Sequence, residues 1–157
     1  MTGLIPSEIG ELTTLSVLKL NYNNLTGSIP KEIGLLTSIN EIFIESNHWT
    51  GSIPIEIGFL SDLVDLNVGN NTLNGNIPSE IGLMTSLTFL NVDTNDLTGT
   101  IPSEIGLLTN LVILNLNNNG LTGPIPSEIG LLTALERLRI GEHFLQCDLC
   151  YELFRFL

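Results

Sequence analysis

The sequence has few basic residues, few cysteines and no long apolar run. Five lysine and arginine residues stand against 17 aspartate and glutamate residues, and the formal net charge is -12 at pH 7. This charge repels phosphate backbones and anionic lipid headgroups, so nucleic acid is not an expected partner. Polar residues interrupt the apolar segments every few positions, and no stretch approaches the roughly 20 residues that span a bilayer. We therefore expect no membrane segment in this chain.

Cysteine is too scarce to supply a disulfide framework or a metal site. The only two cysteines, Cys147 and Cys150, are close together, which is too few for a framework in a domain of this size. Their spacing occurs in redox motifs and zinc knuckles, but a second Cys/His pair is missing. The sequence therefore predicts no bound metal and no cofactor, and a structural or incidental role for both cysteines.

What the sequence has is a repeat of 24 residues. The repeat reads L-x-x-L-x-x-L-x-L-x-x-N-x-L-x-G-x-I-P-x-x-I-G-x, as in residues 108–131, LTNLVILNLNNNGLTGPIPSEIGL. Its first position recurs without insertion or deletion at Leu12, Leu36, Leu60, Met84, Leu108 and Leu132. This period predicts a partial repeat over residues 1–11, five full repeats over 12–131, a degenerate repeat over 132–146 and an apolar tail over 147–157.

The repeat resembles the leucine-rich repeat family, and its G-x-I-P half resembles the plant-type subclass of receptor-kinase ectodomains and polygalacturonase-inhibiting proteins. The resemblance covers residues 2 to about 145. It implies a solenoid, a curved right-handed stack with a short parallel β-sheet on the concave face and loops or 3-10 turns on the convex face. It also implies a non-catalytic receptor or inhibitor role, outside the cell or in the ectodomain of a membrane protein. The scaffold carries many unrelated binding activities, so the motif names no ligand.

Three features of the unit indicate how it folds. The two-residue spacing of Leu-x-Leu sends both side chains of a short strand into the core, and stability should fall toward both ends of the stack. Trp49 occupies a leucine column and is interpreted as an oversized core residue whose indole N–H needs a partner. The asparagine after each strand is interpreted as a structural ladder that satisfies backbone groups in the turn. These residues are Asn23, Asn47, Asn71, Asn95 and Asn119.

The strand positions beside the leucines are expected to point out of the concave face and to bind a protein or peptide ligand. Exposed aromatic residues are the usual anchors of interfaces, so Tyr22, Phe43 and Phe89, with Ile113 nearby, are the strongest candidates. Acidic residues make the first half of this surface negative and favour a basic partner, whereas Arg137 and Arg139 make its end basic. The full set of candidates is Lys19, Tyr22, Glu41, Phe43, Glu45, Asp65, Asn67, Phe89, Asn91, Asp93, Ile113, Asn115, Arg137 and Arg139.

The sequence favours three other functions less than ligand binding. Catalysis is not expected, because an open sheet buries carboxylates poorly and because His48 and His143 lie almost four units apart. A structural or adhesive spacer is the main alternative, since the units are nearly identical. A third is a hydroxyl surface for ice or carbohydrate, although hydroxyls in such a row more commonly cap short helical turns. The row is Thr13, Thr37, Ser61, Thr85, Thr109 and Thr133.

The ends of the chain depart from the repeat. Residues 2–6 align with residues 26–30, so the chain begins inside a unit, and we interpret it as a fragment of a longer receptor-like or secreted protein. The repeat dissolves from about His143, and the apolar tail is a candidate capping helix over the last unit. Asn24 and Asn70 fit the glycosylation sequon, which matters only in a protein of the secretory route.

Overall fold

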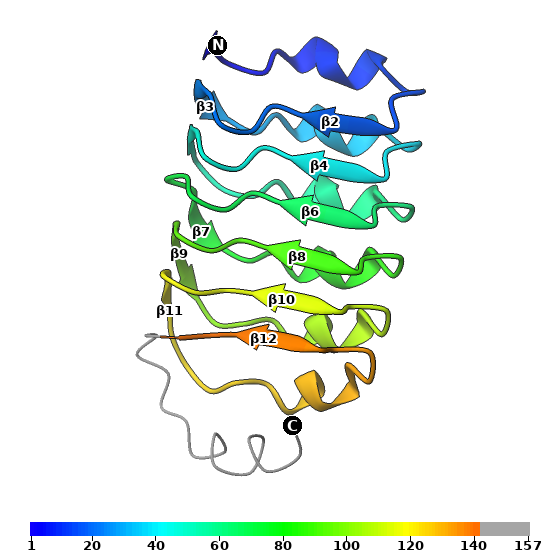
Figure 1. Ribbon diagram of the computed structural model, residues 1–157, viewed down its shortest axis with the longest axis vertical. Helices are drawn as coiled ribbons and strands as arrows, with labels where there is room; N and C mark the ends of the chain where they lie inside the picture. The colour runs from blue at the N-terminus through cyan, green and yellow to red at the C-terminus, as the bar shows by residue number, and fades with distance from the viewer. Residues whose placement is uncertain (142–157) are drawn as a thin grey trace.

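The main sheet is parallel and takes one short strand from each repeat. The computed structural model describes residues 1–141, and the sheet has the order β12-β10-β8-β6-β4-β2. Each strand residue pairs with its equivalent in the next repeat, as Ile113 pairs with Phe89. Figure 1 shows the strands lying one above another along the stack. They are β2 (Val17–Lys19), β4 (Glu41–Phe43), β6 (Asp65–Asn67), β8 (Phe89–Asn91), β10 (Ile113–Asn115) and β12 (Arg137–Arg139).

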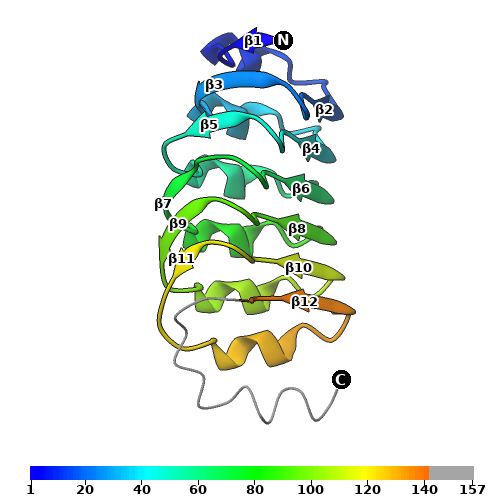
Figure 2. The same cartoon turned by 60° about the vertical axis from the view of Figure 1, so that its left-hand side comes forward.

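The other side of each unit carries a 3-10 helix. The helices lie behind the main sheet in Figure 1 and to the left of its strands in Figure 2. Each begins directly after a proline in the extended conformation. Proline favours the start of a helical turn because its φ is fixed and its missing N–H is not needed there. The described residues contain η1 (Ser7–Glu11), η2 (Lys31–Leu35), η3 (Ile55–Phe59), η4 (Ser79–Leu83), η5 (Ser103–Leu107) and η6 (Ser127–Leu131). The solenoid predicted from the repeat, with a parallel sheet and 3-10 turns, is confirmed.

Two smaller parallel sheets line the segments that connect the main strands to the helices. One has the order β1-β3-β5 and the other β11-β9-β7. A glycine in this segment adopts a positive φ in every described unit, as at Gly75 with a φ of 76°, a conformation that glycine reaches without the penalty of a Cβ. These strands are β1 (Thr2–Gly3), β3 (Asn24–Ser28), β5 (His48–Thr50), β7 (Asn74–Asn76), β9 (Asp96–Gly99) and β11 (Gly120–Leu121).

The hydroxyl row does not cap the helices, so that interpretation of the sequence is wrong. Pro30 precedes η2, and no side chain bonds to the start of the helix. Thr37 instead follows the end of η2, where its own N–H donates to the carbonyl of Leu35 at 2.9 Å. A capping side chain bonds to the free N–H groups at the start of a helix, so a hydroxyl that follows the end of the helix cannot cap it. All six residues of the row are exposed.

The core runs the length of the stack and thins toward its ends. Leu66, Leu90 and Leu114 are fully buried, whereas Leu18 keeps 8% of its surface exposed and Leu138 is only partly buried. This gradient agrees with the expectation that each unit depends on its neighbours for burial. The capping helix predicted for the tail lies outside the described residues.

Trp49 is a core residue, as the sequence predicts. Its side chain is fully buried, and its indole N–H donates to the carbonyl of Ile44 at 3.1 Å. The large side chain therefore leaves no polar group without a partner, which is the usual condition for burying tryptophan.

The asparagine after each main strand joins two neighbouring units through its amide. The Nδ2 of Asn71 donates to the carbonyls of Val68 and Gly69, both at 3.1 Å, within its own unit. It also donates to the carbonyl of Ile44 in the preceding unit at 3.3 Å, and its Oδ1 accepts from the N–H of Trp49 at 3.1 Å. Asn47 and Asn95 repeat this arrangement. We call these amides, from Asn23 to Asn119, the asparagine ladder.

We predict that Asn71→Ala destabilises the protein by about 3 kcal/mol, since buried backbone groups left without a partner cost roughly 1–3 kcal/mol each. Urea unfolding followed by circular dichroism measures the change. The control is Asn24→Ala, which removes an exposed amide and should alter the free energy of unfolding by less than about 0.5 kcal/mol. Equal losses for the two variants would contradict a special role for the ladder.

Candidate functional site

The candidate site is the side of the main sheet that faces away from the core. Alternation along β8 buries Leu90 and turns Phe89 and Asn91 to this side. The strand register then aligns such residues into two rows, which together we call the open face. One row is Val17, Glu41, Asp65, Phe89, Ile113 and Arg137, and the other is Lys19, Phe43, Asn67, Asn91, Asn115 and Arg139.

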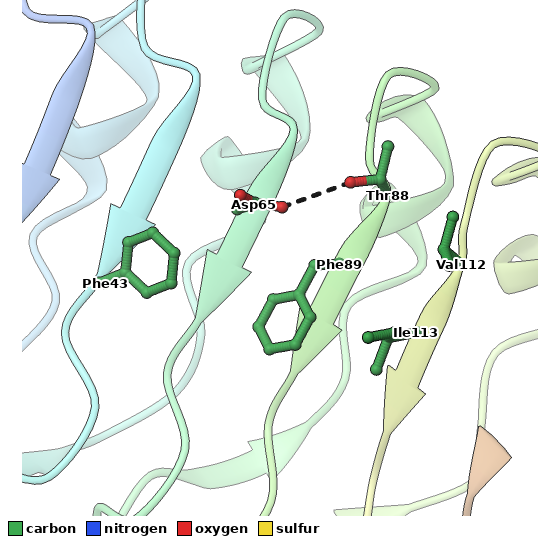
Figure 3. Close-up of a pocket in the computed structure, with 6 residues that line it drawn as sticks. All are labelled: Phe43, Asp65, Thr88, Phe89, Val112 and Ile113. Carbon is green, nitrogen blue, oxygen red and sulfur yellow. Dashed lines mark hydrogen bonds between the residues drawn. The ribbon is translucent and has the colours of Figure 1, made fainter. Parts of the chain in front are cut away.

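A hollow of about 390 Å³ lies across four strands of the open face, from β4 to β10. Figure 3 shows Phe43, Asp65, Phe89 and Ile113 side by side in the order of their strands. The structure thus brings together four of the residues selected from the sequence. The hollow is lined by Phe43, Asp65, Thr88, Phe89, Val112 and Ile113.

Sequence analysis missed two residues of this hollow, Thr88 and Val112. They occupy the position immediately before the strand, where the earlier units have Ser16 and Asn40 and the middle units have Val64, Thr88 and Val112. The change from polar to β-branched residues along this column was the available signal. These side chains are partly exposed at the edge of the sheet, and they extend the apolar wall beside Phe89 and Ile113.

Asp65 is a carboxylate in an otherwise mostly apolar hollow. Its Oδ1 accepts a hydrogen bond from the hydroxyl of Thr88 at 3.3 Å. Within residues 1–141, the one ion pair joins Lys19 Nζ to Glu41 Oε2 at 2.9 Å and leaves Asp65 without a basic partner. Lys19 Nζ also lies 5.2 Å from the centroid of the Phe43 ring, a distance at which a cation is attracted to the ring face.

Two asparagines of the open face bond to each other, and a third bonds within its own unit. Asn91 Nδ2 donates to Asn67 Oδ1 at 3.0 Å, and Asn67 Oδ1 also accepts from the N–H of Gly69 at 3.2 Å. Asn115, expected as an exposed contact residue, is instead buried, with 9% of its surface exposed. It is flanked by paired strands on both sides, and its Oδ1 turns to the N–H of Asn117. The oxygens of these amides are therefore occupied by hydrogen bonds within the protein.

The remaining candidates lie outside the hollow. Glu45 Oε1 accepts from Asn21 at 3.0 Å, and Asp93 Oδ2 accepts from Thr94 at 3.4 Å. Arg137 and Arg139 are exposed on β12. Tyr22 is 76% exposed in the turn after β2, where its φ is 54°, so it does not join Phe43 and Phe89.

Both predicted glycosylation sites lie on the surface. Asn24 and Asn70 are exposed, and Asn70 Nδ2 donates to Ser46 Oγ at 3.1 Å; glycosylation at both stays a prediction. His143, Cys147 and Cys150 lie outside the described residues. Over residues 1–141, no group of three His, Cys, Asp or Glu side chains could hold a metal ion, and no helix of that range is long and apolar enough to cross a membrane.

Known proteins share both the repeat and the fold. A family model described as Leucine Rich Repeat matches residues 14–36, 62–84, 86–108 and 110–132. No curated protein matches the sequence. One similar solved structure is the LRR ectodomain of the plant membrane receptor kinase GASSHO1/SCHENGEN3 from Arabidopsis thaliana, in complex with CASPARIAN STRIP INTEGRITY FACTOR 2. It is 36% identical with a TM-score of 0.89, over 93% of this chain and 17% of that chain.

Two further structures differ in what their proteins bind. The Arabidopsis receptor kinase HAESA, in complex with the peptide hormone IDA and the co-receptor SERK1, is 38% identical with a TM-score of 0.89, over 92% of this chain and 24% of that chain. A plant ice-binding protein is 27% identical with a TM-score of 0.82, over 92% of this chain and 54% of that chain. The chain therefore spans less than a quarter of each receptor ectodomain and about half of the ice-binding protein.

We predict that the side chains of the hollow are dispensable for folding. Phe89 and Leu90 are neighbours on opposite faces of β8, and only Leu90 is buried in the core. Leu90→Ala should therefore lower the free energy of unfolding by about 3 kcal/mol, whereas Phe89→Ala should lower it by less than about 1 kcal/mol. Urea titrations of both variants provide the measurement. A loss for Phe89→Ala that matches the loss for Leu90→Ala would show that the ring is part of the core.

Proposed function

The chain belongs to the leucine-rich repeat family, and we propose that it is a non-catalytic recognition module that binds a peptide through the open face of its main sheet. The observation that carries the proposal is the hollow between β4 and β10, where Phe43 and Phe89 lie partly exposed. Aromatic side chains in such a position supply much of the contact energy of protein interfaces.

The dimensions of the hollow suit a short peptide segment. Its lining residues come from four consecutive strands. Three strand spacings of about 4.8 Å give a width of about 14 Å, which an extended peptide crosses in about four residues. The similar receptor HAESA is described in complex with a peptide hormone, which supports a ligand of this kind.

The charge around the hollow favours a basic ligand. Glu41 and Asp65 lie on the open face, and Glu45 and Asp93 follow its strands β4 and β8. The two arginines of β12 lie at the far end of the face, and the chain as a whole carries a formal charge of -12. Such a field steers cationic partners toward the surface and repels anionic ones.

Catalysis and a purely structural role are less well supported. Glu41 is paired with Lys19 and Asp65 is hydrogen-bonded by Thr88. Both carboxylates lie on an open sheet face rather than in the closed site that acid–base chemistry requires. A spacer needs only the repeated core residues. The aromatic residues Phe43 and Phe89 stand in columns that hold no other aromatic residue, and a spacer has no use for them.

A selection from a random-peptide display library tests peptide binding by the purified domain. We expect the wild-type protein to enrich peptides, and the double variant Phe43→Ala/Phe89→Ala to bind them at least about tenfold more weakly by fluorescence anisotropy. Phe59→Ala is the matched control, because Phe59 is an exposed phenylalanine at the end of η3, away from the open face. Tyr22→Ala should also leave affinity nearly unchanged, since Tyr22 lies outside the hollow. The proposal fails if the wild-type protein enriches no peptide above background.

We propose ice binding as a second candidate function. Two observations favour it: the similarity to a plant ice-binding protein, 27% identical over 92% of this chain, and the exposed hydroxyl row from Thr13 to Thr133. The row presents one hydroxyl per unit at the regular spacing of the stack, which is the arrangement that a crystalline surface can match.

Assays of ice-recrystallisation inhibition and of thermal hysteresis measure this second activity directly. If the hydroxyl row carries it, the triple variant Thr37→Lys/Thr85→Lys/Thr109→Lys loses the activity, because the lysines break the regular row without entering the core. The Phe43→Ala/Phe89→Ala variant serves as the control and should retain it. Absence of both effects in the wild-type protein rules out the second candidate.

A further inference from the structure

Asp65 is the one charged residue that lines the hollow. Its side chain is partly buried in a lining that it shares with Phe43 and Phe89, and the described structure offers it a single hydrogen bond, from Thr88. A carboxylate that is partly removed from water gains most from a partner that is itself a cation. No such partner comes from residues 1–141, so the carboxylate is available to a ligand.

The neighbouring strands strengthen this demand for a cation. The register places Glu41 of β4 directly beside Asp65 of β6. Lys19 lies on β2, the next strand beyond β4. Lys19 pairs with Glu41 at 2.9 Å and lies on the side of β4 away from β6. Lys19 therefore neutralises Glu41 alone, and Asp65, the carboxylate that lines the hollow, is left without a basic partner among residues 1–141.

The aromatic rings provide surfaces that suit a cation as well as an apolar group. The ring of Phe43 already attracts Lys19 Nζ at 5.2 Å, and Phe89 is the direct neighbour of Asp65 on β8. Figure 3 shows Asp65 between the strands that carry the two rings. An ammonium or guanidinium group paired with Asp65 would lie against these rings, where cation–π attraction adds to the ion pair.

We infer that the hollow is a specificity pocket for a lysine or arginine side chain of the bound peptide, with its cation on Asp65 and its methylene stem against Phe43 and Phe89. The inference rests on the proposed peptide binding and names the chemistry of the residue recognised. Val112 and Ile113 continue the apolar wall beyond Phe89, so the pocket favours an apolar residue next to the basic one.

A charge-reversal selection tests the pocket. The same random-peptide library is applied to the wild-type protein, Asp65→Asn, Asp65→Lys and the control Asp96→Lys. Asp96 is exposed on β9, outside the open face, and its reversal changes the net charge equally. We expect wild type and Asp96→Lys to enrich peptides with lysine or arginine beside an apolar residue. Asp65→Lys should enrich aspartate or glutamate instead, and Asp65→Asn should bind the wild-type peptides about tenfold more weakly.

The possible failures are distinct. Peptides enriched by wild type without a basic residue, or an unchanged preference in Asp65→Lys, overturn the pocket while peptide binding at the open face stands. An equal change of preference in Asp96→Lys shows a general effect of net charge and also overturns it. If wild type enriches no peptide, the proposed function fails together with the inference.

Discussion

The amide of the asparagine ladder is the interaction on which the rest of the structure depends. After each main strand the chain turns through a non-glycine residue with positive φ, such as Asn70 at 50°, a conformation that costs energy unless its surroundings hold it. The next residue, Asn71, holds the turn because its amide donates hydrogen bonds to three carbonyls and accepts one from an N–H, across two units. These groups are buried and have no access to water, so the ladder sets where each strand ends and which side chains reach the open face.

The two sides of the main sheet therefore have separate roles. The core side is nearly invariant from unit to unit, because Leu66, Leu90 and Leu114 stack directly on one another. The open side is free to vary, and there aromatic, acidic and amide side chains replace one another in register. The hollow arises from this freedom: large rings on β4 and β8 stand on either side of a smaller residue on β6.

The sequence alone predicts the architecture well because its signal is periodic. Two-residue alternation determines which side of the strand Leu90 and Phe89 occupy, and the 24-residue period determines the register, so the sheet, the core and the burial of Trp49 follow. Features that depend on the neighbouring strands are harder to predict from the sequence. Tyr22 and Phe43 look equivalent in the sequence, yet only Phe43 lines the hollow. Thr88 and Val112 precede their strands, and alternation along a strand does not predict which side a residue before it occupies. The burial of Asn115 depends on the strands at its sides, which no single column of the repeat reveals.

The equal spacing of the strands has a consequence for how recognition can change. Each of β4, β6, β8 and β10 contributes its own wall to the hollow, and each wall belongs to a different unit. Exchange of a whole unit for another of the same length would replace one wall while the backbone of the others kept its place. In such a protein, new binding preferences can arise by recombination of whole units, without several simultaneous substitutions in a packed core.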